Sequence, residues 1–150
     1  MSEHYNRVET DYLGIALDYD SRKTTIQKLI SSIKDSNVEF DCVAFRGVSG
    51  ALFGPVVADH FNKGMAIIRK DKSHSFCNVE YSIKSKSKNI RYIIVDDFIE
   101  TGTTINEIIK GMKGSIGQIC QVRCAGIFLY KKSSGRFNQI QYKNITIYGN

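Results

Sequence analysis

The amino-acid sequence predicts an α/β protein with one mainly parallel β-sheet and helices on both faces. Short apolar segments of strand length alternate with segments whose apolar residues recur at helical spacing, an order typical of parallel strand–helix–strand units. Three loops rich in glycine, threonine or basic residues each follow the carboxyl end of a predicted strand, where ligands bind in such sheets. The 150 residues contain no linker or repeat, which predicts a single domain over 1–150.

The first half of the chain supplies two predicted helices. Apolar residues recur at helical spacing over 21–34, with Ser21 as a candidate N-cap. Residues 40–45 read as a short buried strand that runs into a Gly-rich turn. A second helix is predicted over about 51–61, with Pro55 tolerated in its first turn.

The second half of the chain continues the alternation. Its predicted elements are a strand over 65–68, a mobile polar loop over 71–79, a central strand over 90–95, a helix over 103–112, a long strand over 118–130 and an edge strand over 137–148.

The formal net charge of +6 raises the question of a nucleic-acid partner. Much of the excess comes from Lys84, Lys86, Lys88 and Arg91, which occupy a loop-like stretch and do not follow one helical face. A solvated loop is the favoured interpretation, with part of the positive charge steering a strongly anionic small substrate. We therefore expect no nucleic-acid partner.

The sequence also predicts a cytoplasmic protein without a membrane partner. Its apolar runs are far shorter than the roughly 20 residues of a membrane span, and residues 1–5 lack a signal-peptide pattern. The four cysteines do not show the paired spacing of a structural zinc site, so reduced thiols are expected.

The most informative segment runs from Tyr92 to Thr104. An apolar strand leads into Asp96 and Asp97, and a Thr/Gly loop then opens a helix. Free backbone N–H groups, the helix dipole and threonine hydroxyls favour a phosphate at such a helix start. The two carboxylates upstream suit sugar hydroxyls or a metal ion beside that phosphate. A phosphorylated ribose satisfies both halves; the alternative is an ordinary turn in which Asp97 or Thr101 caps the helix.

Residues 93–104 resemble the 5-phosphoribosyl-1-pyrophosphate (PRPP) motif of type I phosphoribosyltransferases, in which two acidic residues and two variable positions precede a Thr-Gly-x-Thr loop. The Gly-rich stretch 45–51 is similar to the family's pyrophosphate loop, whose unusual cis peptide would lie near Arg46–Gly47. The basic stretch 69–82 resembles the family's catalytic loop. Together the three resemblances cover roughly residues 40–113.

The resemblance implies a type I phosphoribosyltransferase core that moves the 5-phosphoribosyl group of PRPP onto a nucleobase and releases pyrophosphate. The implied PRPP-binding residues are Asp96, Asp97, Thr101, Gly102, Thr103, Thr104, Arg46, Gly47, Arg69 and Lys70. The implied catalytic residues are Asp96, Asp97, Glu100, Lys72, His74 and Glu80. Mg²⁺ is the expected cofactor, held mainly by the substrate, with Asp96 and Asp97 as candidate protein ligands.

The nature of the base is less determined. Glu100 favours a purine, because hypoxanthine-guanine members of the family carry an acidic residue there for the purine N7 proton. An exposed acid that complements the helix start is the alternative. Residues 1–20 and 131–150 would form a small hood over the base, and a homodimer is expected from the family. The alternative function is a catalytically weak PRPP- or nucleotide-binding regulatory module of the same fold.

Overall fold

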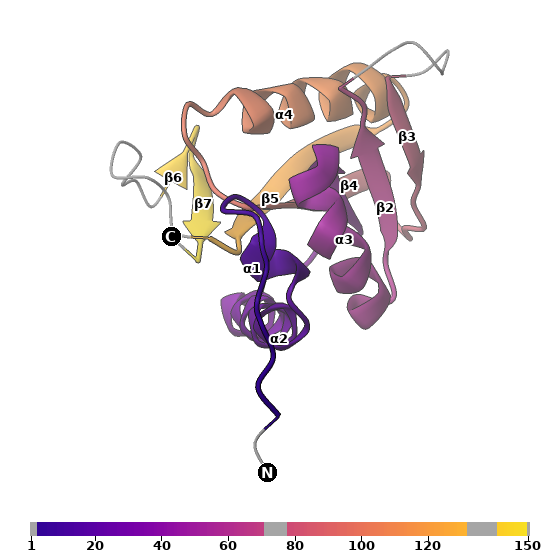
Figure 1. The fold of residues 1–150 in the computed structure, drawn as a ribbon. Helices are drawn as coiled ribbons and strands as arrows, with labels where there is room; N and C mark the ends of the chain where they lie inside the picture. The colour runs from indigo at the N-terminus through magenta and orange to yellow at the C-terminus, as the bar shows by residue number, and fades with distance from the viewer. Residues whose placement is uncertain (1–2, 71–77, 132–140, 150) are drawn as a thin grey trace.

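A computed structural model describes residues 3–70, 78–131 and 141–149, and it contains one seven-stranded sheet in the order β3-β2-β1-β4-β5-β7-β6 (Figure 1). The strands are β1 (Cys42–Arg46), β2 (Gly64–Ile68), β3 (Val79–Ser82), β4 (Asn89–Asp96), β5 (Gln121–Leu129), β6 (Gln141–Tyr142) and β7 (Ile145–Tyr148). The helices are α1 (Gly14–Leu17), α2 (Tyr19–Ser36), α3 (Gly47–Phe61), α4 (Thr103–Ser115) and the 3₁₀ turn η1 (Ile116–Gln118).

The predicted α/β class is confirmed. The pairs β2–β1, β1–β4, β4–β5 and β5–β7 are parallel, whereas β3 and β6 pair antiparallel at the two edges. Helices α2 and α3 cover one face of the sheet and α4 covers the other (Figure 1).

Both faces of the central strand β4 are buried, which explains its uninterrupted apolar sequence. Ile93 and Val95 pack in the core beneath α2 and α3, while Tyr92 and Ile94 pack in the core beneath α4. Because successive side chains of a strand point to opposite faces, one short apolar run supplies both cores.

Two predicted helix starts differ from the structure. Helix α2 begins at Tyr19, and its cap is the Asp18 side chain, which accepts the Ser21 N–H at 3.0 Å, so the prediction of Ser21 as the cap is wrong. Helix α3 begins at Gly47, immediately after β1, so Pro55 lies inside the helix and not in its first turn. Gly47 has a φ of +74°, a backbone conformation that lets a glycine turn from strand to helix in one residue.

The C-terminal segment also differs from its prediction as one edge strand. Within its described part, β7 pairs parallel with β5 and β6 folds back as the edge. Lys143 and Asn144 join the two strands, and both have positive φ, as a tight two-residue hairpin turn requires. The predicted loop over 71–79 lies outside the described residues except at its end, where Val79 already begins β3.

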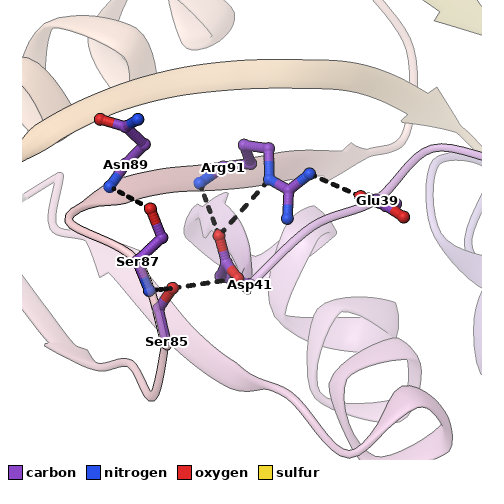
Figure 2. A network of polar contacts seen from close by, with 6 residues as sticks. All are labelled: Glu39, Asp41, Ser85, Ser87, Asn89 and Arg91. Atoms are coloured by element: carbon purple, nitrogen blue, oxygen red, sulfur yellow. Dashed lines mark hydrogen bonds and ion pairs between the residues drawn. The ribbon is translucent and has the colours of Figure 1, made fainter.

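A polar network fixes the loop between β3 and β4 at the amino end of the sheet (Figure 2). Asp41, just before β1, accepts the Arg91 amide N–H at 2.9 Å and the Ser85 hydroxyl at 3.3 Å. The Arg91 guanidinium donates to Glu39 at 2.7 Å, and Ser87 accepts the Asn89 N–H at 3.0 Å. The loop that carries Lys84, Lys86 and Lys88 is therefore anchored at the end of the sheet opposite to the three predicted ligand loops.

None of the helices in the described ranges combines the length and the apolar character needed to cross a bilayer.

Candidate functional site

The parallel order β2-β1-β4 brings the three predicted loops together at the carboxyl edge of the sheet. A cavity of about 170 Å³ lies there. Every residue of the PRPP-like loop from Asp96 to Ile105 lines this cavity. Three residues from other segments, Tyr12, Ser49 and Lys70, complete the lining.

Asp96 and Asp97 form a buried acidic pair, with 3% and 4% of their surfaces exposed. Asp96 Oδ1 accepts the Ser49 hydroxyl at 3.1 Å. Asp97 Oδ1 accepts the Phe98 N–H at 2.8 Å, and its Oδ2 accepts the Tyr12 hydroxyl at 2.6 Å. Each ion pair found in the described part of the chain lies elsewhere, so these contacts leave the acidic pair without a cationic partner there.

The electrostatics of this pair favour an added cation. Burial, and after it the neighbouring charge of Asp97, raises the pKa of Asp96 to about 7. A divalent cation would relieve both causes, and two adjacent carboxylates suit Mg²⁺, which binds proteins through few side chains. No group of three or more metal-ligating side chains occurs among the described residues.

The start of α4 is open to an anion. Its N-cap is Gly102, with a φ of +84° and no side chain of its own, and among the first-turn N–H groups that of Thr103 donates to the Thr101 hydroxyl at a long 3.4 Å. The hydroxyls of Thr101 and Thr103 contact each other at 2.9 Å at this helix start. Asp97 does not cap the helix, because its carboxylate is bonded to Phe98 and Tyr12. The first-turn N–H groups therefore favour a bound phosphate.

A second cavity, of about 530 Å³, lies beside the first and is strongly basic. Arg46, Arg69, Lys70 and Lys110 contribute to its lining, and Lys70 lines both cavities. The Arg46 Nε atom is buried and has no hydrogen-bond partner within the described residues. A buried donor without a partner costs free energy, so an anionic ligand in this cavity would be stabilised.

Not every predicted site residue faces one of the two cavities. The Arg69 guanidinium donates to Glu80 at 2.8 Å, so these two residues pair with each other across β2 and β3. Glu80 lines neither cavity, whereas Glu100 is exposed and lines the smaller one. Lys72 and His74 lie outside the described residues. No cis peptide bond occurs in the described ranges, so the expectation for Arg46–Gly47 is wrong.

The sequence did not point to several residues that line or support the site. The Tyr130 hydroxyl donates to the Ser49 carbonyl at 2.5 Å, which supports the residue that holds Asp96. Tyr12 and Lys131 come from the predicted hood segments, and the Lys131 ammonium donates to the Tyr12 carbonyl. These are contacts across 81 and 119 residues of chain, and no local pattern reports them.

Both hood segments reach the PRPP-like loop. Tyr12 contacts Asp97, and a Cβ added to Gly102 would lie 2.8 Å from the Tyr142 hydroxyl oxygen. A larger cavity, of about 1000 Å³, lies at the amino ends of β4 and β5. None of the predicted site residues lines that cavity.

The parallel sheet, the loop constellation and the flanking hood segments define a protein of the type I phosphoribosyltransferase fold. The chain belongs to the phosphoribosyl transferase domain family, whose model matches residues 18–147.

Among curated proteins, an adenine phosphoribosyltransferase from Bifidobacterium longum is 31% identical over 107 residues, covering 63% of this chain and 55% of that protein. An orotate phosphoribosyltransferase from Streptococcus mutans is 26% identical over 138 residues, covering 89% of this chain and 64% of that protein. The chain thus spans about half to two thirds of the length of these relatives.

Solved structures share the fold at low identity. An orotate phosphoribosyltransferase from Aeropyrum pernix has a TM-score of 0.65 at 14% identity, covering 92% of this chain and 75% of that one. An adenine phosphoribosyltransferase from Trypanosoma brucei, in complex with AMP, pyrophosphate and ribose 5-phosphate, has a TM-score of 0.62 at 15% identity, covering 89% and 65%.

Proposed function

We propose that the protein transfers the 5-phosphoribosyl group of PRPP to a nucleobase and releases pyrophosphate. The observation that carries the proposal is the buried pair Asp96 and Asp97 placed just before the Thr-Gly start of α4, whose N-cap is Gly102. The pair and the helix start suit the two ends of one phosphorylated sugar.

The sugar phosphate is assigned to the loop that opens α4. Its oxygens accept hydrogen bonds from the first-turn N–H groups and from the hydroxyls of Thr101, Thr103 and Thr104, and Gly102 lets the backbone approach closely. Asp96 and Asp97 accept hydrogen bonds from the ribose hydroxyls.

The pyrophosphate group is assigned to the basic cavity beside the sugar pocket. Arg46 supplies a buried donor and Lys70 lines both cavities, so each can contact a group that leaves the sugar carbon. Gly47 leaves room for Lys70, since a Cβ at Gly47 would lie 2.7 Å from the Lys70 Cε atom. Arg69 also lines this cavity while it pairs with Glu80, and we assign Arg69, Lys72 and His74 to the same leaving group.

Mg²⁺ is the proposed cofactor, with Asp96 and Asp97 as its protein ligands. When bound, it supplies charge neutralisation of the phosphate and sugar oxygens.

As the bond to pyrophosphate breaks, the leaving group takes the bonding electrons, and positive charge develops at the sugar carbon and is shared by the ring oxygen. A nitrogen of the base forms the new bond to that carbon. Two carboxylates in a buried setting stabilise this charge more strongly than they would in water. The phosphate loop and the basic cavity hold the two ends of PRPP in place, which lowers the entropic part of the barrier.

We propose a purine as the acceptor, with orotate as the competing candidate. Glu100 is exposed at the cavity and is the carboxylate available to exchange a proton with a purine nitrogen. Both adenine and orotate enzymes occur among the relatives.

A regulatory module is the second candidate function. A transcriptional regulator, GfcR of Methanocaldococcus jannaschii, is 25% identical over 143 residues, covering 87% of this chain and 66% of that protein. In a regulatory role, the present chain would bind PRPP without releasing pyrophosphate.

Pyrophosphate release separates the two candidates. The protein is incubated with PRPP, Mg²⁺ and, in separate reactions, adenine, hypoxanthine, guanine or orotate. We expect release with at least one purine.

Asp97→Asn should weaken PRPP binding by about 10- to 100-fold, since a hydrogen bond to a charged group is lost. Asp35→Asn, at an exposed carboxylate of α2, is the matched control and should bind as the wild type does. PRPP binding without release for any base supports the regulatory module.

We further propose a cytoplasmic homodimer. Ile15 and Leu17 of α1 and Tyr19 at the start of α2 are large apolar residues that are exposed. Such a group of side chains is typical of an interaction surface, and sedimentation at micromolar concentration measures the oligomeric state.

A further inference from the structure

The hydroxyl of Tyr12 occupies the acidic pair from the side of the hood. It donates to Asp97 Oδ2 at 2.6 Å. This contact joins residues 85 positions apart in the sequence. Asp97 also accepts the Phe98 N–H through its other oxygen, so both carboxylate oxygens are engaged.

Three further contacts hold Tyr12 in this position. The Lys131 ammonium donates to the Tyr12 backbone carbonyl and lies 4.8 Å from the centre of the Tyr12 ring. The ring meets Phe98 edge-on, with 6.3 Å between ring centres.

The occupied pocket is small for the proposed ligand. With Tyr12 in its lining, the cavity measures about 170 Å³. Ligand sites commonly measure about 300–1000 Å³. The phenol also makes the hydrogen bond that a sugar hydroxyl would make to Asp97. A phosphorylated ribose therefore competes with Tyr12 for the same carboxylate oxygen.

We propose that Tyr12 acts as an internal substitute for the sugar hydroxyl: it closes the ribose pocket while the pocket is empty, and the phosphorylated ribose displaces it. This inference rests on the proposed function. Residues 10–13 form the closing segment, and Lys131 holds this segment in the closed position through its contacts with Tyr12. The contact keeps the acidic pair covered until a ligand with both a phosphate and a hydroxyl arrives.

Ribose 5-phosphate titrated by calorimetry tests the proposal, because it carries the phosphate and the hydroxyls without the leaving group. Tyr12→Phe keeps the ring and removes the competing hydroxyl, so it should bind ribose 5-phosphate about tenfold more tightly than the wild type. Lys131→Met removes the contacts of Lys131 with Tyr12 and should also raise the affinity for ribose 5-phosphate. Tyr5→Phe, at a tyrosine that is 82% exposed and lines neither cavity, is the control and should match the wild type.

Hydrogen exchange provides the second readout. The Gly14 N–H donates to the Thr10 carbonyl at 3.0 Å while Tyr12 is seated. Ribose 5-phosphate should lower the protection of residues 10–14 in the wild type and raise that of residues 101–105. In Tyr12→Phe, residues 10–14 should exchange faster even without the ligand.

Two sets of results distinguish the inference from the function beneath it. If the wild type binds ribose 5-phosphate and both Tyr12→Phe and Lys131→Met bind it equally or more weakly, the displacement of Tyr12 is overturned. The proposed function then remains intact. If neither the wild type nor any variant binds ribose 5-phosphate or PRPP, the proposed function is overturned, and the role of Tyr12 with it.

Discussion

Asp96 and Asp97 bring two carboxylates into the interior at the end of β4, where one charge disfavours the other. Ser49, Phe98 and Tyr12 supply one hydrogen bond each. Hydrogen bonds offset part of the cost of burying charge, but the pair has no cationic partner in the described part of the chain. The free protein therefore holds a strained electrostatic arrangement that a cation or a hydroxyl-bearing ligand stabilises.

The free protein should lose stability as the pH rises from about 4 to about 7. Burial raises the pKa of Asp96 from 3.8 to about 7, so in that window the folded state binds a proton that the unfolded state has released. At about 1.4 kcal/mol for each pH unit between the two values, the loss is up to about 4 kcal/mol. Urea unfolding in the presence of a chelator, at intervals across this window, measures it.

Asp96→Asn is the matched variant, because it keeps the shape of the side chain and removes the titration. Its stability should change less with pH over the same window than that of the wild type. Equal pH dependence of the two proteins would contradict the assignment of the raised pKa to Asp96.

At the scale of the element, the start of α4 depends on a single glycine. Gly102 has a φ of +84°, and a Cβ there would lie 2.8 Å from the Tyr142 hydroxyl oxygen. A side chain at this position would both strain the backbone and press the C-terminal hairpin away from the loop.

Gly102→Ala should therefore destabilise the protein by about 1–3 kcal/mol and weaken binding of ribose 5-phosphate. Gly114→Ala in the same helix is the control: nothing lies within 4 Å of its Cβ position, and it should stabilise the protein by about 0.5–1 kcal/mol without changing binding. Denaturant unfolding measures both effects. A neutral Gly102→Ala would show that the turn tolerates other residues.

The elements follow from the sequence where local signals agree. The apolar run over 90–95 predicted the central strand, and the structure confirms it as β4. The start of α2 was misplaced because Asp18 and Ser21 are both good capping residues, and the preference between them depends on where the chain enters the helix. The hairpin of β6 and β7 was missed because its turn residues Lys143 and Asn144 do not form one of the common glycine-containing turn pairs.

At the scale of the whole molecule, the site is assembled from segments that are distant in sequence. The three loops could be predicted to share one edge because each follows the carboxyl end of a predicted parallel strand, and the observed strand order places them there. The contacts of Tyr12 with Asp97 and of Tyr130 with Ser49 were not predictable, because they depend on how the two chain ends pack over the sheet. The hood was expected from the chain ends, but its closing residue became visible only in three dimensions.

A crystal structure of the protein soaked with ribose 5-phosphate and Mg²⁺ tests the central claim most directly. We predict that the phosphate lies on the first turn of α4 at Thr101–Thr104, that the ribose hydroxyls contact Asp96 and Asp97, and that the Tyr12 hydroxyl has left Asp97. A sugar phosphate bound elsewhere, or a site that stays empty with Tyr12 still bonded to Asp97 at saturating ligand, would contradict the account.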